Sequence, residues 1–412
     1  MKKRLNLIYG SILVWIMVSC QIQKPVETGL DQISEFSHLF KNKRIGIITN
    51  HTAYNLKNEN IIDIFSNQVE AKINALFGPE HGIHGENAAG EKVADQIDTD
   101  TKIPIYSLYG KTLKPTPEML QNIDVLVFDI QDIGARFYTY IHTMSLAMEA
   151  AAENNITFVV LDRPNPINGI DIEGNILERE FATFVGLYPI PVRHGMTVGE
   201  LASMINGEGW LKNHVEANLY VVPMKGWMRE FWFDNTGLKW RPPSPNIPDL
   251  NVATVYPGTC LFEGTNISEG RGTYKPFLVI GTPWFYNDQF SMINKLIDLP
   301  GVQFGPISFT PISIPNMAPE PKYINLKLTG VSLFITDRKT FRPYLTGIAL
   351  VKFLYEIDKR NFKWNTNHFD RLCGSNRIRE FITKGKTVED IKFWIDQGLA
   401  DFKQIRTKYL LY

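Results

Sequence analysis

The chain has little cysteine and no net charge. Its 412 residues contain three cysteines, and 43 Lys and Arg balance 43 Asp and Glu. A zero balance gives no general basic field for nucleic acid, so we expect no nucleic-acid partner. Hydrophobic residues at 44% and charged residues at 21% are ordinary for a globular protein. These values exclude a mostly disordered chain, a fibrous repeat and a multi-span membrane protein.

Two of the cysteines, Cys260 and Cys373, lie in the second half of the chain. In an oxidising compartment they allow one disulfide. Two free buried thiols fit the sequence equally well, so both arrangements remain open at this point.

The N-terminus has the pattern of an export signal. Basic residues 2–4 precede an apolar run over residues 5–18, which is too short to cross a membrane comfortably. The run ends in Val18-Ser19-Cys20, which resembles a bacterial lipoprotein box. We therefore predict a signal peptide over residues 1–19, lipidation of Cys20, and a tether over residues 20–40. The product would be an exported lipoprotein, anchored in a membrane and facing the periplasm or the cell surface; an ordinary cleaved signal or a short anchor is the alternative.

The first half of the chain alternates between short apolar runs and helical patterns. Strands are expected at 44–49, 72–77, 103–108, 125–128, 157–161 and 220–223, with helices at 59–65, 140–153 and 197–205. Strands that do not alternate in polarity indicate a mostly parallel sheet covered on both faces. The sequence thus predicts a Rossmann-like α/β domain over residues 41–250.

A proline-rich segment, residues 240–248, then connects to a different pattern. Expected strands at 324–328 and 331–335 are mixed with expected helices at 343–358, 377–384 and 388–406. We predict a smaller α+β domain over residues 251–412. The glycine-containing stretch from Tyr256 to Lys275 is expected to be a loop that closes a cleft over the sheet, opposite Glu80.

Several catalytic motifs are missing. Neither G-x-G-x-x-G nor G-x-x-x-x-G-K-[ST] follows the first expected strand, so a nucleotide cofactor loses its main support. The G-x-S-x-G elbow of serine hydrolases is also missing, which disfavours an esterase or a peptidase.

Polar residues gather instead at the carboxyl ends of the expected strands, where parallel sheets bind ligands. The densest group runs from Gly78 to Glu91. Metal binding is possible in principle there, through Glu80, His81, His84 and Glu86. However, the run is too rich in glycine to hold both histidines on one helix face, so no metal is expected. Glycosidic cleavage needs a carboxylic acid that stays protonated near neutral pH together with a second group. Glu80, directly after an apolar strand, is the best candidate for that acid.

Five segments then resemble the exo-β-N-acetylmuramidase (NamZ) family of bacterial cell-wall glycosidases. They are GPEHGIHGENAAGE from Gly78, FDIQDIGARFYTY from Phe128, LDRPNPINGIDIEG from Leu161, PVRHGMTVGELA from Pro191 and PGTCLFEGTNISEGRGT from Pro257. The resemblance extends from about residue 42 to residue 412. It implies a Rossmann-like domain, a smaller C-terminal domain and a cleft between them. It also implies removal of terminal N-acetylmuramic acid from the non-reducing ends of peptidoglycan fragments, with no nucleotide or metal cofactor.

The resemblance also suggests residue roles. Glu80 is the leading catalytic carboxylate, Glu173 and Asp129 are candidates for the second group, and His81 would orient groups or relay protons. The remaining candidates would contact substrate: Asn50, Gln131, Arg136, Tyr138, Arg163, Asn165, His194, Glu263, Asn266 and Arg271. An arginine in the pocket would suit the lactyl carboxylate of muramic acid. The alternatives are a glycan-binding lipoprotein without turnover and an exported hydrolase of another class.

Overall fold

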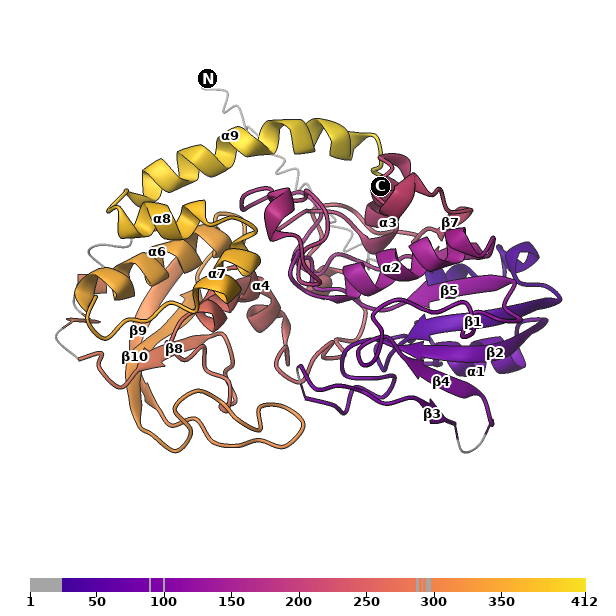
Figure 1. Cartoon of the computed structure of the whole chain (residues 1–412), viewed down its shortest axis with the longest axis horizontal. Helices are drawn as coiled ribbons and strands as arrows, with labels where there is room; N and C mark the ends of the chain where they lie inside the picture. Colours follow the sequence, from indigo (N-terminus) through magenta and orange to yellow (C-terminus); the bar gives the residue numbers. More distant parts are fainter. Residues whose placement is uncertain (1–23, 89, 99–100, 287–288, 291, 294–297) are drawn as a thin grey trace, which may run out of the picture.

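The computed structural model describes residues 24–88, 90–98, 101–286, 289–290, 292–293 and 298–412. These residues form an N-terminal domain built on a large sheet and a C-terminal domain built on a small one. Figure 1 shows the two domains side by side, with the last helix running across both. The predicted signal peptide and Cys20 lie outside the described residues.

The sheet of the N-terminal domain is parallel except for one edge strand. Its order is β3-β4-β2-β1-β5-β6-β7, and only the contact between β3 and β4 is antiparallel. The strands are β1 (Lys43–Thr49), β2 (Ala71–Gly78), β3 (Gln96–Ile97), β4 (Pro104–Ser107), β5 (Val125–Asp129), β6 (Thr157–Leu161) and β7 (Leu219–Val222). The order reverses direction between β1 and β5. In such sheets the carboxyl ends beside a reversal form a crevice for ligands.

Both faces of this sheet are covered, which explains why its strands are apolar throughout. Successive side chains of a strand point to opposite faces. In β5, Leu126 and Phe128 pack into one hydrophobic core, whereas Val125 and Val127 pack into the other. Helices α2 (Tyr140–Glu153) and α3 (Val198–Gly207) contribute to the first core, and α1 (Ile61–Asn67) with the short helices η1 (Gly29–Gln32) and η2 (Ser37–Leu39) to the second. The predicted Rossmann-like α/β class is confirmed.

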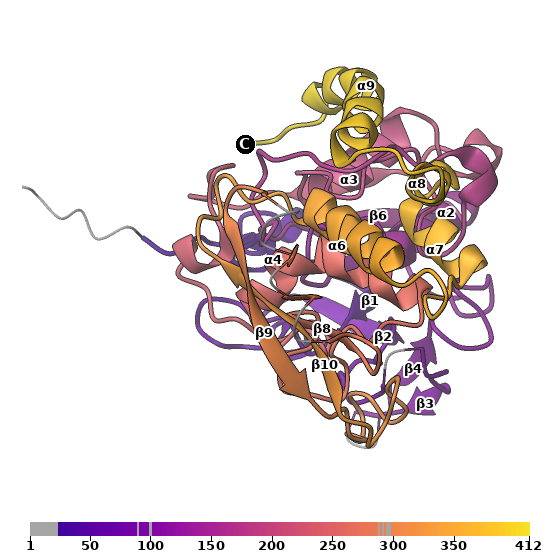
Figure 2. The same cartoon turned by 90° about the vertical axis from the view of Figure 1, so that its left-hand side faces the viewer.

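The C-terminal domain packs helices against a three-stranded antiparallel sheet of order β8-β10-β9. Figure 2 views this domain face-on. Its strands are β8 (Val279–Thr282), β9 (Val302–Phe309) and β10 (Leu328–Ile335), and its helices are α4 (Leu250–Thr259), α6 (Pro343–Ile357), α7 (Thr366–Cys373), α8 (Arg377–Thr383) and α9 (Val388–Thr407). Helices α4 and α6 touch through Gly258 and Gly347. A Cβ on Gly347 would lie 2.2 Å from the Gly258 oxygen, so larger residues would push the helices apart.

Short 3₁₀ helices occupy the connections: η3 (Arg179–Phe181), η4 (Lys212–His214), η5 (Phe233–Asn235) and η6 (Cys260–Gly264). In the described part of the chain, no helix has the length and apolarity needed to cross a bilayer.

Three expectations need correction. The strand expected at 324–328 is wrong, because residues 322–325 form a turn and β10 begins only at Leu328. The loop expected from Tyr256 begins as the end of α4 and continues into η6. The tether does not extend to residue 40, because Val26, Leu30 and Phe40 are buried against the domain. Their apolar side chains gain more from burial than from free movement in water.

Cys260 and Cys373 are both buried and unpaired, so the two-thiol alternative holds.

A buried arginine joins the two domains. The guanidinium of Arg136 is fully buried, and its Nη1 donates hydrogen bonds of 2.8 Å to the carbonyl oxygens of Asn175 and Ile190. Its Nη2 donates to the carbonyl oxygens of Leu372, at 3.1 Å, and Cys373, at 2.7 Å, at the end of α7. Burial lowers the pKa of Arg136 to about 10, so the side chain is still a cation at neutral pH. The group that we predicted to bind substrate is therefore used to hold the domains together.

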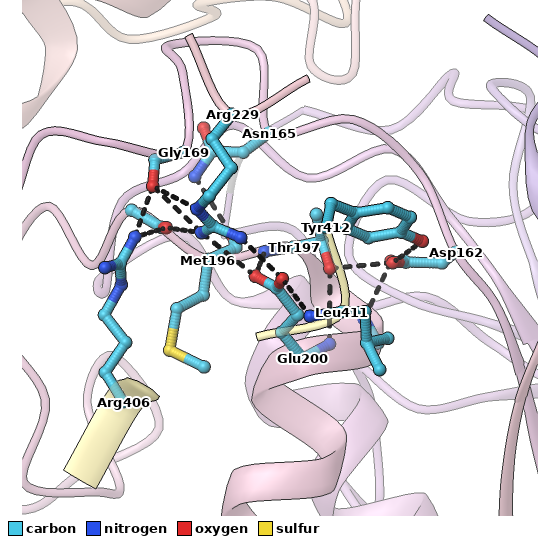
Figure 3. A network of polar contacts seen from close by, with 12 residues as sticks. Asp162, Asn165, Gly169, Met196, Thr197, Glu200, Arg229, Arg406, Leu411 and Tyr412 are labelled. Carbon is cyan, nitrogen blue, oxygen red and sulfur yellow. Dashed lines mark hydrogen bonds and ion pairs between the residues drawn. The ribbon is translucent and has the colours of Figure 1, made fainter. Parts of the chain in front are cut away.

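The C-terminal tail makes a second connection between the domains. Helix α9 crosses from the C-terminal domain to α3, and its end enters a polar network in the N-terminal domain (Figures 1 and 3). The Tyr412 hydroxyl donates to Asp162 at 2.7 Å, and the Leu411 amide donates to Glu200 at 2.9 Å. Arg406 donates to the carbonyl oxygens of Gly169 and Gly195. The last residues thus fix the position of α9 on the N-terminal domain.

We expect Arg136→Ala to lower the free energy of unfolding by about 3–5 kcal/mol, because it removes four buried hydrogen bonds and the large buried side chain that donates them. The measurement is chemical denaturation followed by circular dichroism. Arg377→Ala is the control: that side chain is 56% exposed and pairs with Glu178 at 3.4 Å. Its loss should cost no more than about 1 kcal/mol. Equal effects of the two substitutions would contradict the structural role of Arg136.

Candidate active site

A cavity of about 610 Å³ lies between the two domains. The N-terminal domain contributes residues from the ends of β2 and β4 and from the loop before α2. The C-terminal domain contributes the loop after α4, the segment 317–322 and α7. The polar side chains of the lining are Glu80, His81, Tyr109, Tyr138, Thr139, Ser244, Asn246, Tyr256, Glu263, Glu269, Arg271, Glu320, Lys322 and His368. The prediction that the loop bearing Glu263 and Arg271 reaches the Glu80 segment is confirmed.

Glu80 is held by neutral donors. It follows β2 directly and is half-buried. One carboxylate oxygen accepts the Gly90 amide at 2.9 Å, and the other accepts the Thr139 hydroxyl at 2.8 Å. The Tyr109 hydroxyl is also within hydrogen-bonding range, and burial together with the charge of Glu80 raises the Tyr109 pKa above its usual value. These partners fix the orientation of the carboxyl group without a direct ion pair.

His81 sits beside Glu80 with a defined tautomer. Its backbone has a φ of 70°, an uncommon left-handed conformation for a residue with a side chain. Its Nδ1 lies 2.6 Å from the carbonyl oxygen of Asn87, and because that oxygen can only accept, Nδ1 carries the proton. Burial lowers the His81 pKa, which favours the neutral ring. Its Nε2 is therefore a proton acceptor, as a relay requires.

The opposite wall carries a network of ion pairs. Arg271 donates to Glu263 at 2.7 Å and lies 3.6 Å from Glu269, while Lys322 contacts Glu269 at 2.9 Å. His368 lies 3.5 Å from the second oxygen of Glu263. Burial alone would raise the pKa of Glu263, but Arg271 and His368 hold it at about 2. The two walls therefore differ: Glu263 is a fixed anion, whereas Glu80 has hydroxyl and amide partners.

Tyr138 is the other predicted residue that lines this cavity. It is buried, and its ring packs edge-on against Tyr140 at 4.8 Å and against Tyr256 at 6.0 Å. Its hydroxyl has no hydrogen-bond partner in the described structure. A buried hydroxyl at a cavity wall without a partner is suited to bind a ligand oxygen.

Asp129, Arg163 and Gln131 lie elsewhere. Asp129 is fully buried and forms an ion pair with Arg163, whose Nη2 lies 2.9 Å from the carboxylate. Gln131 and Arg163 line a separate cavity of about 270 Å³ beside the carboxyl ends of β1, β5 and β6. Asp129 is not part of the lining of the larger cavity, because its side chain is enclosed beneath Arg163.

Glu173 is also distant from the Glu80 cavity lining. It is buried between the domains, where one carboxylate oxygen accepts the Leu345 amide of α6 at 2.8 Å. Burial raises its pKa to about 7. The sequence suggested a catalytic partner for Glu80, but the structure shows a carboxyl group that contacts the start of α6.

Four further predicted residues use their polar atoms on the protein itself. Asn50 accepts the Thr52 amide and hydroxyl, Asn165 donates to the Met196 carbonyl, and Asn266 bonds the backbone of residues 361 and 363. His194 accepts the Met196 amide at 3.2 Å, and burial lowers its pKa to about 3, so it is neutral. These four residues therefore stabilise loops, near the strand ends and at the base of the closing loop.

Sequence reasoning missed Tyr109, Thr139, Lys322 and His368 as cavity residues. Thr139 was detectable, since it follows Tyr138 in one of the recognised segments. Tyr109 and His368 belong to no recognised segment, so only the folded chain brings them to the cavity. Among the described residues, no group of three or more His, Cys, Asp or Glu side chains is arranged to hold a metal ion.

A parallel-sheet domain and a smaller α+β domain that enclose a carboxylate-bearing pocket define a two-domain α/β glycosidase. Two family models cover the chain: the N-terminal domain of exo-β-N-acetylmuramidase NamZ matches residues 45–251, and its C-terminal domain matches residues 254–412. The chain belongs to the exo-β-N-acetylmuramidase NamZ family.

Individual relatives agree with this assignment. The chain is 48% identical over 393 residues to the peptidoglycan β-N-acetylmuramidase NamZ of Bacillus subtilis strain 168, covering 95% of this chain and 92% of the relative. Two crystal structures of DUF1343 family proteins from Bacteroides fragilis NCTC 9343 superpose with TM-scores of 0.85 and 0.77. Their identities are 38% and 36%, and each match covers 94% of this chain and 99% of the neighbour.

Glu173→Gln tests whether Glu173 acts in the protein core or in catalysis. Because the folded-state pKa of about 7 lies above the ordinary value of 4.5, the protonated group stabilises the fold at low pH. That stability is lost as the pH rises from 4.5 through about 7. The amide introduced by the substitution stays neutral at every pH. Between pH 4.5 and pH 8 we therefore expect the free energy of unfolding of the variant to fall by about 1–3 kcal/mol less than that of the wild type.

The measurement is urea unfolding across this pH range, with exposed Glu180→Gln as the control. Turnover by the Glu173 variant should remain near normal. A large loss of kcat with an intact fold would return Glu173 to the catalytic machinery.

Proposed function

We propose that this chain is an exo-acting glycoside hydrolase that removes terminal β-1,4-linked N-acetylmuramic acid from the non-reducing ends of peptidoglycan fragments, in cell-wall turnover and recycling. The observation that carries the proposal is Glu80, held by neutral donors in a cavity that the second domain closes. Membership of the NamZ family and the Bacillus relative support the same reaction.

In this proposal Glu80 transfers the proton at the glycosidic bond. Its two neutral donors fix the carboxyl group at the cavity wall, within reach of a bound sugar. Neutral His81, with a free acceptor at Nε2, is placed to accept or relay a proton beside it. Of the two candidates for the second group, neither Asp129 nor Glu173 lines the cavity; Glu263 does, as a permanent anion.

Arg271 is the proposed contact of the lactyl carboxylate. It lines the cavity, and Glu263 and Glu269 fix its position. Those two carboxylates also cancel much of its charge. We therefore expect shape and hydrogen bonding, rather than net charge, to provide most of the selectivity for muramic acid.

We propose exo action because both domains contribute walls to the cavity around Glu80. An enzyme that cuts within a chain needs an open groove, whereas here segments from both domains line one cavity. Digestion of peptide-free glycan chains should release muramic acid as a monosaccharide from the start, while the mean chain length falls slowly. Chromatography of products at early times makes the measurement. A rapid fall in chain length with little monosaccharide would contradict the proposal.

Glu80→Gln should lower kcat by at least about 10²-fold, the scale expected for loss of a general acid or base, while the unfolding free energy changes little. The amide keeps an oxygen and the size of the side chain, so binding of the glycan should persist. The assay is release of the aryl group from a chromogenic muramide, with binding measured by calorimetry. Near-normal turnover would remove Glu80 from the mechanism; binding without turnover in the wild type would favour a glycan-binding protein.

We also propose that the chain is exported and lipidated at Cys20. Support comes from the basic, apolar and small-residue pattern that ends at this cysteine, and from the start of the folded domain only a few residues later, at Val26. The anchor would keep the enzyme at a membrane that faces the periplasm or the cell surface.

Cys20→Ala should abolish lipid modification and move the protein from the membrane fraction to the soluble fraction. The reason is that stable anchoring depends on several acyl chains together. Fractionation and mass spectrometry of the mature N-terminus are the measurements. Activity on soluble fragments should be unchanged, because the cavity lies in the folded domains. A soluble wild-type protein whose mature chain does not begin at Cys20 would refute the anchor.

A further inference from the structure

A second cavity, of about 560 Å³, is a groove on the surface of the N-terminal domain. We call it the aromatic groove. Its apolar lining includes Leu177, Leu187, Tyr188 and Trp210. The rings of Tyr188 and Trp210 are stacked, with centroids 5.9 Å apart and an interplanar angle of 16°. Nothing in the reaction at Glu80 requires this pair.

The charges of the aromatic groove have one sign. Arg179 and Lys212 line it and are exposed, and none of the described residues in its lining is acidic. Two carboxylates close to the groove have partners of their own. Glu178 pairs with Arg377, and Glu149 pairs with Lys114 and accepts the backbone amide of Lys212 at 2.6 Å. An apolar floor with flat rings and an exposed cationic rim is suited to a sugar chain that carries carboxylates.

The aromatic groove is connected to the Glu80 cavity by a single tight turn. Thr183 and Gly186 exchange two backbone hydrogen bonds of 2.8 Å. Within and after this turn, Val185 lines the Glu80 cavity, whereas Leu187 and Tyr188 line the groove.

Ring contacts continue the connection beneath the surface. Tyr109 of the cavity lies 6.0 Å from Phe184, and buried His142 lies 6.4 Å from both Phe184 and Tyr188. These ring contacts therefore form a continuous row beneath the turn, from the cavity to the groove.

We propose that the aromatic groove binds the remainder of the glycan chain, on the other side of the cleaved bond from the terminal muramic acid. This inference rests on the proposed function, which supplies a substrate whose end enters the Glu80 cavity. Trp210 stacks on a sugar of the remainder, and Arg179 and Lys212 pair with the lactyl carboxylates that recur along it. The groove thereby favours chains over single sugars without taking part in bond cleavage.

The test compares two substrates in the full chain: a chromogenic muramide, which has one sugar, and peptide-free peptidoglycan chains. For Trp210→Ala we expect the KM for chains to rise about 5–10-fold, the scale of a lost aromatic contact. The kcat and KM for the chromogenic muramide should change less than about twofold, because that substrate ends before the groove. Tyr220→Ala, at an exposed aromatic residue of β7 outside the groove, is the control for general surface effects.

A double variant, Arg179→Ala with Lys212→Ala, tests the charges. In the wild type the KM for chains should rise with salt, and the double variant should lose most of that dependence. Equal KM values for chains in the wild type and the Trp210 variant would overturn the inference. So would an equal rise for both substrates, since that would mean the groove acts through the fold of the cavity.

The failure of the proposed function would be recognised separately. A wild-type protein that releases nothing from either substrate fails that proposal, and the groove is then tested by calorimetric binding of the glycan chains alone. Binding that is weaker in the Trp210 variant than in the Tyr220 variant supports the groove. Equal binding in the two variants rejects it.

Discussion

The position of one domain against the other depends on a buried cation. Arg136 lies in the N-terminal domain, just before α2. Its side chain donates to two carbonyl oxygens at the end of α7, 236 and 237 residues later in the chain. Carbonyl oxygens, rather than a carboxylate, satisfy its guanidinium, so the connection is directional and demands one geometry. The α7 helix that it holds also carries His368 into the cavity. The same helix thus links the Arg136 contact to one wall of the pocket.

The C-terminal tail acts at the other end of the same interface. Tyr412 binds Asp162, which follows β6 and accepts hydrogen bonds from the start of α3, and Leu411 binds Glu200 in the first turn of α3. Helix α9 spans the distance back to the C-terminal domain. Arg136 holds the interface from within, and α9 holds it from outside (Figure 1). Two separated contacts restrict rotation between domains more than one could. A pocket whose walls come from both domains needs that restriction, because catalysis is sensitive to small displacements.

Within the pocket, the two walls have different electrostatic roles. Glu263, Glu269, Arg271 and Lys322 neutralise one another and form a rigid polar surface. Glu80 and His81 are held by hydroxyl, amide and carbonyl groups, which fix their positions. One wall is therefore held by ion pairs and the other by neutral hydrogen bonds. Arg271 is already paired with Glu263 and Glu269, so its presence in the pocket does not by itself create an anion-binding site.

The sequence alone predicted the parallel strands of the N-terminal domain and the two-domain fold class, and it singled out Glu80 as the leading carboxylate. It did not predict α4, α7, β8 or β9. Apolar strands without alternation specify a sheet covered on both faces, as the two cores around β5 show. The position of Glu80 followed from the rule that parallel strands present their carboxyl ends to a ligand. These are local or periodic properties, which a chain displays before it folds.

Only the tertiary structure decided which polar residues share the cavity. Arg136 lies in the same recognised segment as the cavity residues Tyr138 and Thr139, yet it binds the protein itself. Asn165 and Glu173 lie in a recognised segment that contributes nothing to the cavity lining, and both also bind the protein itself. A buried polar group must find a partner, and the partner is chosen by contacts between segments that lie far apart in the chain. His368 shows the converse, since no motif marks it, and α7 brings it to Glu263. The sequence determined which residues could do the chemistry; the packing of the two domains determined which of them are free to do it.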